Sequence, residues 1–422
     1  MAVAIAGVLL PLPAFAQEPA PHGDAAWVLC ASALVLFMTL PGLALFYGGL
    51  VRARNLLSVL MHCFSICCVV SILWCLIGYS LAFAPGNFFL GGTSRAFLAG
   101  LAPATQGSGL PEGLIVLFQM TFAVITPALI IGAFPERVSF PFLLLFSALW
   151  MLVVYVPTAH WVWGQGWLAQ YGTIDFAGGI VVHTTAGVSA LVLALVIGKR
   201  RGFPNELLPP HSPGLTMAGA GMLWVGWFGF NGGSALAADH SAVMAILATH
   251  LAASAAALTW MAIEWLRLGK PTSVGLVTGA VAGLATITPA SGFVGPMGAL
   301  GIGFLGGAAC LYATSFVKQH LRIDDTLDVF AVHGVGGMLG SILVALFAAR
   351  QIGGVGYATG MDTALQLKAQ IVGVAAVAVW SAGLTLVLAR LIGFVVPVRV
   401  SAEDEYEGLD LATHGERAYE HG

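Results

Sequence analysis

Residues 155–201 read YVPTAHWVWGQGWLAQYGTIDFAGGIVVHTTAGVSALVLALVIGKRR. A tryptophan-rich segment is followed by Asp175, then by an apolar helix with His183 near its middle, then by three basic residues. A histidine inside hydrocarbon is costly, because lipid offers its ring nitrogens no hydrogen-bond partner. We therefore expect His183 to line a cavity or to pair with another polar group.

A second apolar stretch repeats this arrangement. Residues 324–350, DDTLDVFAVHGVGGMLGSILVALFAAR, carry His333. Each histidine follows an aspartate by eight residues, His183 after Asp175 and His333 after Asp325. We interpret the chain as a membrane conduit built around the two histidines.

The composition supports a membrane protein. Of 422 residues, 59% are hydrophobic and 8% are charged, whereas a soluble domain has about 25% charged residues. The 54 glycines suit helices that pack backbone to backbone. Without a basic patch beyond short loops, nucleic-acid binding is excluded. The six cysteines lie in apolar spans without metal-ligand spacing, so we expect packing roles, no metal and no cofactor.

The N-terminal residues 1–16, MAVAIAGVLLPLPAFA, have the short apolar core of a secretory signal peptide. The segment ends in an A-x-A cleavage pattern at Ala16, which predicts a mature start at Gln17. The alternative is an additional membrane helix, against which Pro11, Pro13 and the short length argue.

Eleven further apolar spans are predicted within residues 17–394, each long enough to cross ~30 Å of hydrocarbon. They are 25–49, 56–83, 112–134, 140–158, 175–198, 214–236, 241–266, 272–290, 297–317, 327–349 and 363–394. With the mature N-terminus outside, only Arg95, Arg350 and Lys368 of the 16 basic residues fall on the outer side. This bias predicts an outer N-terminus and residues 395–422 as a cytoplasmic tail.

The two histidines lie in the fifth and the tenth span. Spans one to five and six to ten are therefore candidate repeats, and because five is odd the second repeat is inverted. Eight residues at 1.5 Å each place His183 and His333 ~12 Å from opposite membrane faces. In a core of ~30 Å, the two rings then lie within roughly 6 Å of the same depth.

Three interpretations of the histidine pair remain open: a structural pair, ligands of a metal or haem, and polar members of a narrow pore. His62 and His250 are scattered, and no carboxylates accompany the pair at mid-membrane. These features disfavour ligation and a membrane redox protein. We favour the pore, in which the rings offer hydrogen bonds and a proton relay to a small molecule.

Aromatic residues gather where the outer mouth is expected: Phe118, Phe122, Trp163 and Phe230, with Trp163 in the loop before the fifth span. Tryptophan at a membrane interface is ordinarily part of the aromatic belt. Aromatic faces beside a hydroxyl such as that of Ser234 also suit a weakly hydrated cation that donates hydrogen bonds.

At these residues the sequence resembles the ammonium transporter family (Amt/Mep/Rh), particularly its bacterial members. The resemblance covers essentially the whole mature chain. It is carried by LFMTLPGLALFYGGLVRARN, IGAFPERVSF, TAHWVWGQGWLAQYGTIDFAGGIVVH, GWFGFNGGSA, ITPASGFVGP, DDTLDVFAVHGVGG and EGLDLATHGERAYE. It implies an all-α membrane protein of eleven transmembrane helices, an inverted five-plus-five repeat with an extra C-terminal helix, assembled as a homotrimer with one pore in each protomer.

The resemblance also implies site roles. Trp163, Phe122, Phe230 and Ser234 are similar to the family's outer recruitment site for ammonium, with Phe118 nearby. Phe122 and Phe230 are in addition similar to the phenyl gate below that site.

Further roles lie deeper in the span. His183 and His333 are similar to the family's twin pore histidines. Asp175 resembles an aspartate that supports the outer site without touching the ligand, which is compatible with a helix N-cap. Asp325 and Thr288 are expected to give structural support.

The resemblance implies transport of ammonium or methylammonium, and no enzymatic activity. Ammonium would be captured outside and deprotonated, and ammonia would cross the bilayer past the histidines. The tail and inner loops resemble those that bind the PII-type nitrogen regulatory protein, although such a tail is equally compatible with plain surface. The alternative function is an ammonium sensor that signals through a regulatory partner.

Overall fold

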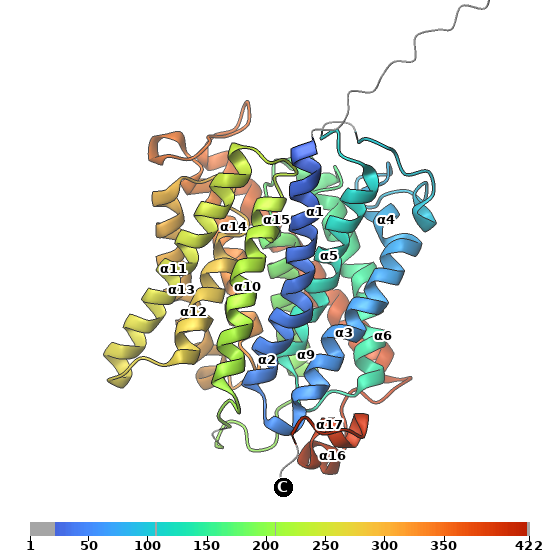
Figure 1. Ribbon diagram of the computed structural model, residues 1–422, viewed down its shortest axis with the longest axis vertical. Helices are drawn as coiled ribbons and strands as arrows, with labels where there is room; N and C mark the ends of the chain where they lie inside the picture. Colours follow the sequence, from blue (N-terminus) through green and yellow to red (C-terminus); the bar gives the residue numbers. More distant parts are fainter. Residues whose placement is uncertain (1–21, 106–107, 207, 420–422) are drawn as a thin grey trace, which may run out of the picture.

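The computed structural model describes residues 22–105, 108–206 and 208–419, and these residues form a bundle of helices without a named strand. Long helices run side by side along one direction, and the tail helices lie together at one end of the bundle (Figure 1). The predicted signal peptide at 1–16 lies outside the described residues. The described chain is all-helical, as the sequence predicted.

The first half of the chain contains helices up to residue 197. In order they are α1 (His22–Phe37), η1 (Met38–Leu43), α2 (Ala44–Leu50), η2 (Ala53–Asn55), α3 (Leu56–Leu73), η3 (Trp74–Gly78), α4 (Tyr79–Phe83), η4 (Ala96–Leu98), α5 (Glu112–Ile130), η5 (Ile131–Ala133), α6 (Phe140–Trp150), η6 (Met151–Tyr155), α7 (Val156–Val162), α8 (Trp167–Tyr171), η7 (Gly179–Thr184) and α9 (Thr185–Ile197).

The second half continues to the C-terminal tail. Its helices are α10 (Pro213–Gly233), α11 (His240–Leu268), α12 (Ser273–Ile287), α13 (Pro296–Ser315), η8 (Phe316–His320), η9 (Phe330–Val335), α14 (Gly336–Phe347), η10 (Arg350–Ile352), α15 (Thr363–Gly393), α16 (Ala402–Glu407) and α17 (Leu409–His414).

Each predicted span overlaps a helix. Within the described ranges, nine helical segments are long and apolar enough to cross a bilayer: His22–Leu50, Ala53–Phe83, Glu112–Ala133, Phe140–Tyr171, Gly179–Ile197, His240–Leu268, Pro296–His320, Phe330–Phe347 and Thr363–Gly393. The other two predicted spans coincide with α10 and with the 15-residue apolar helix α12. At 1.5 Å per residue, α12 is only ~22 Å long.

The predicted end of one span, at residue 158, was wrong, and the correct boundary changes the structural setting of Trp163. The span predicted to end at residue 158 continues through α7, and the apolar helical segment extends to Tyr171. Trp161 therefore belongs to a helix, and Trp163 is the C-terminal cap of that helix rather than part of an irregular loop. A helix end holds Trp163 in a defined position.

Segments from the two halves meet at the centre of the bundle. Helix α9 packs against η9, and α14 packs against η7. At the first crossing, Gly187 and Gly334 approach so closely that a methyl group on Gly187 would overlap the Gly334 backbone. Glycine at such crossings allows close helix packing in a membrane. The histidine-bearing segments are therefore in direct contact.

The C-terminal tail folds back onto the N-terminal end of α3. The Asp410 carboxylate accepts hydrogen bonds from the backbone N–H groups of Ser58 (2.7 Å) and Leu57 (3.1 Å), and so caps the first turn of α3. The backbone N–H of Leu409 donates to Asn55 Oδ1 at 2.8 Å. Two short helices, α16 and α17, are thereby held against the bundle (Figure 1).

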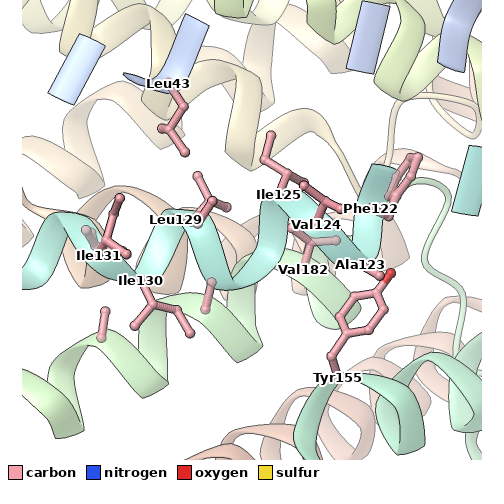
Figure 2. Packing of buried hydrophobic residues seen from close by; sticks show 14 of the residues in the cluster. Leu43, Phe122, Ala123, Val124, Ile125, Leu129, Ile130, Ile131, Tyr155 and Val182 are labelled. Atoms are coloured by element: carbon pink, nitrogen blue, oxygen red, sulfur yellow. The ribbon is translucent and has the colours of Figure 1, made fainter. Parts of the chain in front are cut away.

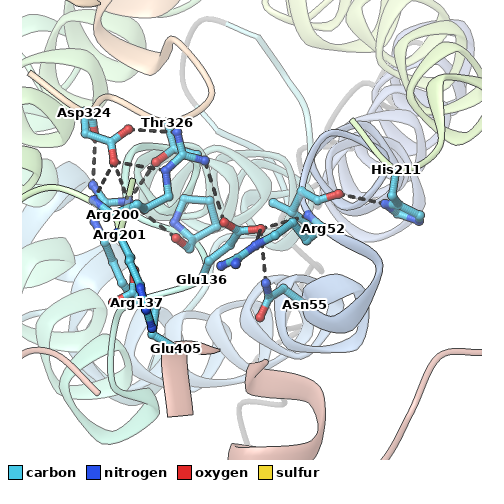
Figure 3. Close-up of polar contacts among 12 residues, drawn as sticks. Arg52, Asn55, Glu136, Arg137, Arg200, Arg201, His211, Asp324, Thr326 and Glu405 are labelled. Carbon is cyan, nitrogen blue, oxygen red and sulfur yellow. Dashed lines mark hydrogen bonds and ion pairs between the residues drawn. The ribbon is translucent and has the colours of Figure 1, made fainter. Parts of the chain in front are cut away.

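An ionic network ties together the loops beside the tail (Figure 3). Arg200 pairs with Asp324 at 2.9 Å, Arg52 pairs with Glu136 at 3.0 Å, and the fully buried Arg137 donates to the Asp324 carbonyl at 2.7 Å. Burial opposes ionisation of Asp324 and Glu136. The guanidinium groups, of Arg200 for Asp324 and of Arg52 and Arg200 for Glu136, outweigh that effect and hold both pKa values below their ordinary values.

Candidate functional site

The two histidines lie side by side in the centre of the bundle. His183 Nδ1 and His333 Nδ1 are 3.2 Å apart. The ring centroids are 5.2 Å apart, and the angle between the ring planes is 20°. The exposed fractions are 1% and 3%. Because a hydrogen bond between two ring nitrogens needs one donor and one acceptor, the neutral rings hold different tautomers.

Each histidine occupies a π-helical turn that an aspartate begins. The Asp175 carboxylate accepts hydrogen bonds from four consecutive backbone N–H groups, of Gly178, Gly179, Ile180 and Val181, at 2.7–3.0 Å. Asp325 accepts from Val329 (3.1 Å) and Phe330 (2.8 Å). The following turns are η7 with His183 and η9 with His333. Both carboxylates therefore accept hydrogen bonds from backbone N–H groups at helix N-termini, and they do not point into a pathway.

A stack of aromatic rings closes one side of the histidine pair, the side that the sequence analysis predicts to face outward. Phe122 and Phe230 stack at 4.2 Å and 25°, and both are 1% exposed. Trp163 sets its edge against Phe122 at 5.9 Å and 90°. Phe118 packs on Phe122 at 5.0 Å and is fully buried, so it backs the stack and does not face outward.

Trp163 and Ser234 are the partly exposed members of this group. The Trp163 indole donates to the backbone carbonyl of Asp175 at 2.8 Å, which fixes the ring plane. The Ser234 hydroxyl donates to the Phe230 carbonyl at 2.8 Å. Its oxygen lone pairs remain free to accept a hydrogen bond from a cation.

A narrow apolar cavity connects the aromatic stack to the histidines. Its volume is about 10 Å³, near the minimum that holds one water molecule. Phe230, His183 and His333 line it together with Met38, Leu43, Phe46, Ile125, Leu129, Val182, Leu223, Trp227 and Val281. Figure 2 shows part of this apolar wall, with Ile125 and Leu129 on α5 and Val182 nearby. This lining contains no charged side chain.

Comparison with known proteins decides the family. The family model for the Ammonium Transporter Family matches residues 26–419. The chain belongs to the ammonium transporter family. An ammonium transporter of Bacillus subtilis (strain 168) is 47% identical over 403 residues, which cover 94% of this chain and 98% of that protein.

Solved structures agree with this assignment. The structure titled Sensor Amt Protein has a TM-score of 0.87 at 30% identity and covers 93% of this chain and 98% of its own. Mep2 of Saccharomyces cerevisiae has a TM-score of 0.83 at 37% identity, over 92% and 91%. This ammonium transporter is therefore a multi-pass membrane protein and a transporter rather than an enzyme.

The sequence did not single out Trp227, which completes the wall of the pathway in this ammonium transporter. Its indole stacks on the His183 ring at 5.5 Å and 23° and donates to Thr288 Oγ1 at 2.8 Å. Thr288, for which the sequence predicted structural support, is fully buried and accepts this hydrogen bond from Trp227. Trp227 lies three residues before Phe230, which puts both side chains on one helix face. This spacing is the sequence signal that could have identified Trp227.

On the other side of the histidine pair lies a larger cavity lined by both charged and apolar side chains. This inner cavity has a volume of about 580 Å³, and His333 is one of its lining residues. Lys318 and Asp328, paired at 2.8 Å, line it together with Arg200 and Glu206. Among the described residues, no group of three His, Cys, Asp or Glu side chains is arranged to hold a metal ion.

Proposed function

We propose that this ammonium transporter captures ammonium at Trp163 and Ser234 and that the cation gives its proton to solvent at the outer side of the phenyl stack. Neutral ammonia then passes the histidine pair and takes up a proton from solvent on the inner side. The observation that carries the proposal is the narrow apolar cavity between the histidine pair and Phe230, which stacks on Phe122. Moving an ion out of water into surroundings without a compensating charge costs many kcal/mol, whereas a small neutral base passes at far lower cost.

Capture follows from the partly exposed groups of the outer mouth. The aromatic face of Trp163 attracts a cation, and the free lone pairs of Ser234 accept one of its N–H bonds. Potassium offers no hydrogen to Ser234. Discrimination in favour of ammonium is thereby built from hydrogen bonding as well as from the ring face.

The histidine pair supplies polar contacts in the apolar pathway. His183 Nε2 is buried without a protein partner, and His183 lines the cavity. Ammonia both donates and accepts hydrogen bonds, so it pairs with a neutral imidazole in either tautomer. The shared bond between the two Nδ1 atoms offers a route for a proton between the rings.

The wider architecture is part of the same proposal. Eleven membrane spans form an inverted five-plus-five repeat with an added C-terminal span, and Asp175 and Asp325 as equivalent helix caps support the inversion. The mature protein begins near residue 17, faces outward at its N-terminus and assembles as a homotrimer in the bacterial cytoplasmic membrane. The inner loops and the folded tail present a surface to a PII-type regulatory protein.

Substitution of the histidines tests the conduction route. His183→Ala and His333→Ala should still assemble as trimers in size-exclusion chromatography but lose charge-coupled ammonium transport in proteoliposomes. Removing a ring leaves its partner unpaired and widens the pathway, so a potassium leak is the expected by-product. Wild-type ammonium currents without potassium leak in both variants would show that the pair is only a scaffold.

Ammonium sensing is the second candidate, and the similarity to the structure titled Sensor Amt Protein favours it. A sensor needs the outer capture site but not conduction. Ammonium binding without any flux of methylammonium or charge in proteoliposomes would support sensing over transport.

A further inference from the structure

A buried histidine in the last turn of α7 has a backbone carbonyl oxygen at hydrogen-bond distance from each of its two ring nitrogens. His160 is 2% exposed. Its Nδ1 lies 2.9 Å from the Ala82 carbonyl oxygen, and its Nε2 lies 2.8 Å from the Asn87 carbonyl oxygen. A carbonyl oxygen can only accept, so both ring nitrogens must carry hydrogen for both bonds to form.

We propose that His160 is held as an imidazolium that clamps the outer loop onto the end of α7 and thereby positions Trp163 for ammonium capture. A neutral imidazole has only one N–H, and its second nitrogen would set a lone pair against a carbonyl oxygen at hydrogen-bond distance. The doubly protonated ring alone satisfies both contacts.

Burial opposes a charged ring, and two features of the site offset this cost. The two carbonyl dipoles point at the ring nitrogens at short range. In addition, His160 lies in the last turn of α7, where the helix dipole presents its negative end. Charge-assisted hydrogen bonds of this kind are stronger than neutral ones.

Other titratable side chains lie on the elements packed against α7. The titratable side chains on elements packed against α7 are Tyr79 on α4, Tyr155 on η6, Tyr171 on α8 and His183 on η7. In the part of the chain that the structure describes, the two hydrogen bonds to Ala82 and Asn87 are the polar contacts of the His160 ring. The Asp175 carboxylate, beyond Trp163, is occupied by backbone N–H groups.

The clamp reaches Trp163 through the helix end. The backbone N–H of Gly166 donates to the His160 carbonyl at 2.9 Å, and that of Trp163 donates to the Ala159 carbonyl at 2.7 Å. On the other side, Trp161 Nε1 donates to the Phe89 carbonyl at 2.9 Å. A carbon added to Gly164 would contact His160 Nδ1 at 2.7 Å, so the turn after Trp163 lies directly against the ring.

Nitrogen-15 NMR of the histidine-labelled trimer in lipid nanodiscs tests the protonation state. At about pH 7.5 we expect a pair of imidazolium ring signals that disappears in His160→Gln. His160→Asn is the second variant if the first does not assemble. Neutral-tautomer signals for His160 at this pH would overturn the proposal.

Uptake in proteoliposomes tests the positioning role. His160→Gln should raise the half-saturation concentration for ammonium roughly two- to tenfold, because one bond of the clamp is lost, and leave the maximal rate nearly unchanged. His240→Gln, at an exposed outer-face histidine, is the matched control and should match the wild type. An unchanged half-saturation concentration in His160→Gln would refute the role. The NMR measurement does not depend on transport, so this inference and the conduction route fail separately.

Discussion

The substitution Gly337→Ala gives a direct test of how helix packing sets the histidine pair. A methyl group on Gly337 would lie 2.6 Å from the Cβ of His183 and 2.7 Å from the carbonyl oxygen of Gly179. Ordinary van der Waals contact begins at 3.4 Å. His183 must therefore move by ~0.8 Å or more, and neither contacted atom is at the end of a flexible side chain.

That displacement acts on a hydrogen bond with little tolerance. The Nδ1 atoms of His183 and His333 are 3.2 Å apart, so a movement of His183 by this amount away from Gly337 disrupts the geometry of their hydrogen bond. Overpacking of this kind costs about 1–3 kcal/mol of stability. We expect Gly337→Ala to lower the unfolding temperature of the purified protein and to reduce ammonium flux in proteoliposomes at least tenfold.

The matched control is Gly383→Ala on α15. A Cβ at Gly383 meets nothing within 4 Å, so the same chemical change should be neutral or stabilise the helix by about 0.5–1 kcal/mol. Wild-type flux and stability in Gly337→Ala would refute the reasoning, because the helices would then have room that the structure denies them.

Three other predictions follow from the outer mouth, the inner network and the topology. Trp163→Leu and Ser234→Ala should each weaken ammonium capture by roughly 0.5–2 kcal/mol, and unchanged half-saturation concentrations would remove the support for the capture site. The pKa of Asp324 is depressed, so its stabilising contribution is present above its ordinary value and is lost as the pH falls through the lower folded pKa. Thermal unfolding should therefore show declining stability below about pH 4, and a flat profile there would contradict it. A cysteine replacing Arg200 should react with a membrane-impermeant thiol reagent only from the cytoplasmic side, and labelling from outside would overturn the orientation.

Much of the site could be predicted from spacing, because helix rise converts sequence distance into membrane depth. Eight residues separate Asp175 from His183 and Asp325 from His333, and two spans in opposite directions bring such positions to one level. The structure places the two rings in contact. Apolar length likewise predicted the positions of the helices, since a run of ~20 apolar residues is needed to cross the bilayer.

The direction in which each side chain points around its helix axis, and so the residues that it contacts, could be known only from the tertiary structure. The direction of a side chain in a span depends on π-helical turns such as η7 and η9, which insert an extra residue into the helix and leave little signal in composition. The stacking of Trp227 on His183 and the extension of the helix through Trp161 were not predicted for this reason.

The two carbonyl oxygens facing His160 show the same limit most clearly. They belong to Ala82 and Asn87, about 75 residues earlier in the chain. A backbone carbonyl has the same chemistry in every residue, so sequence identity carries no information about where it points. The sequence by itself determined the depth and type of the groups in this membrane protein, whereas only the fold decided which of them face one another.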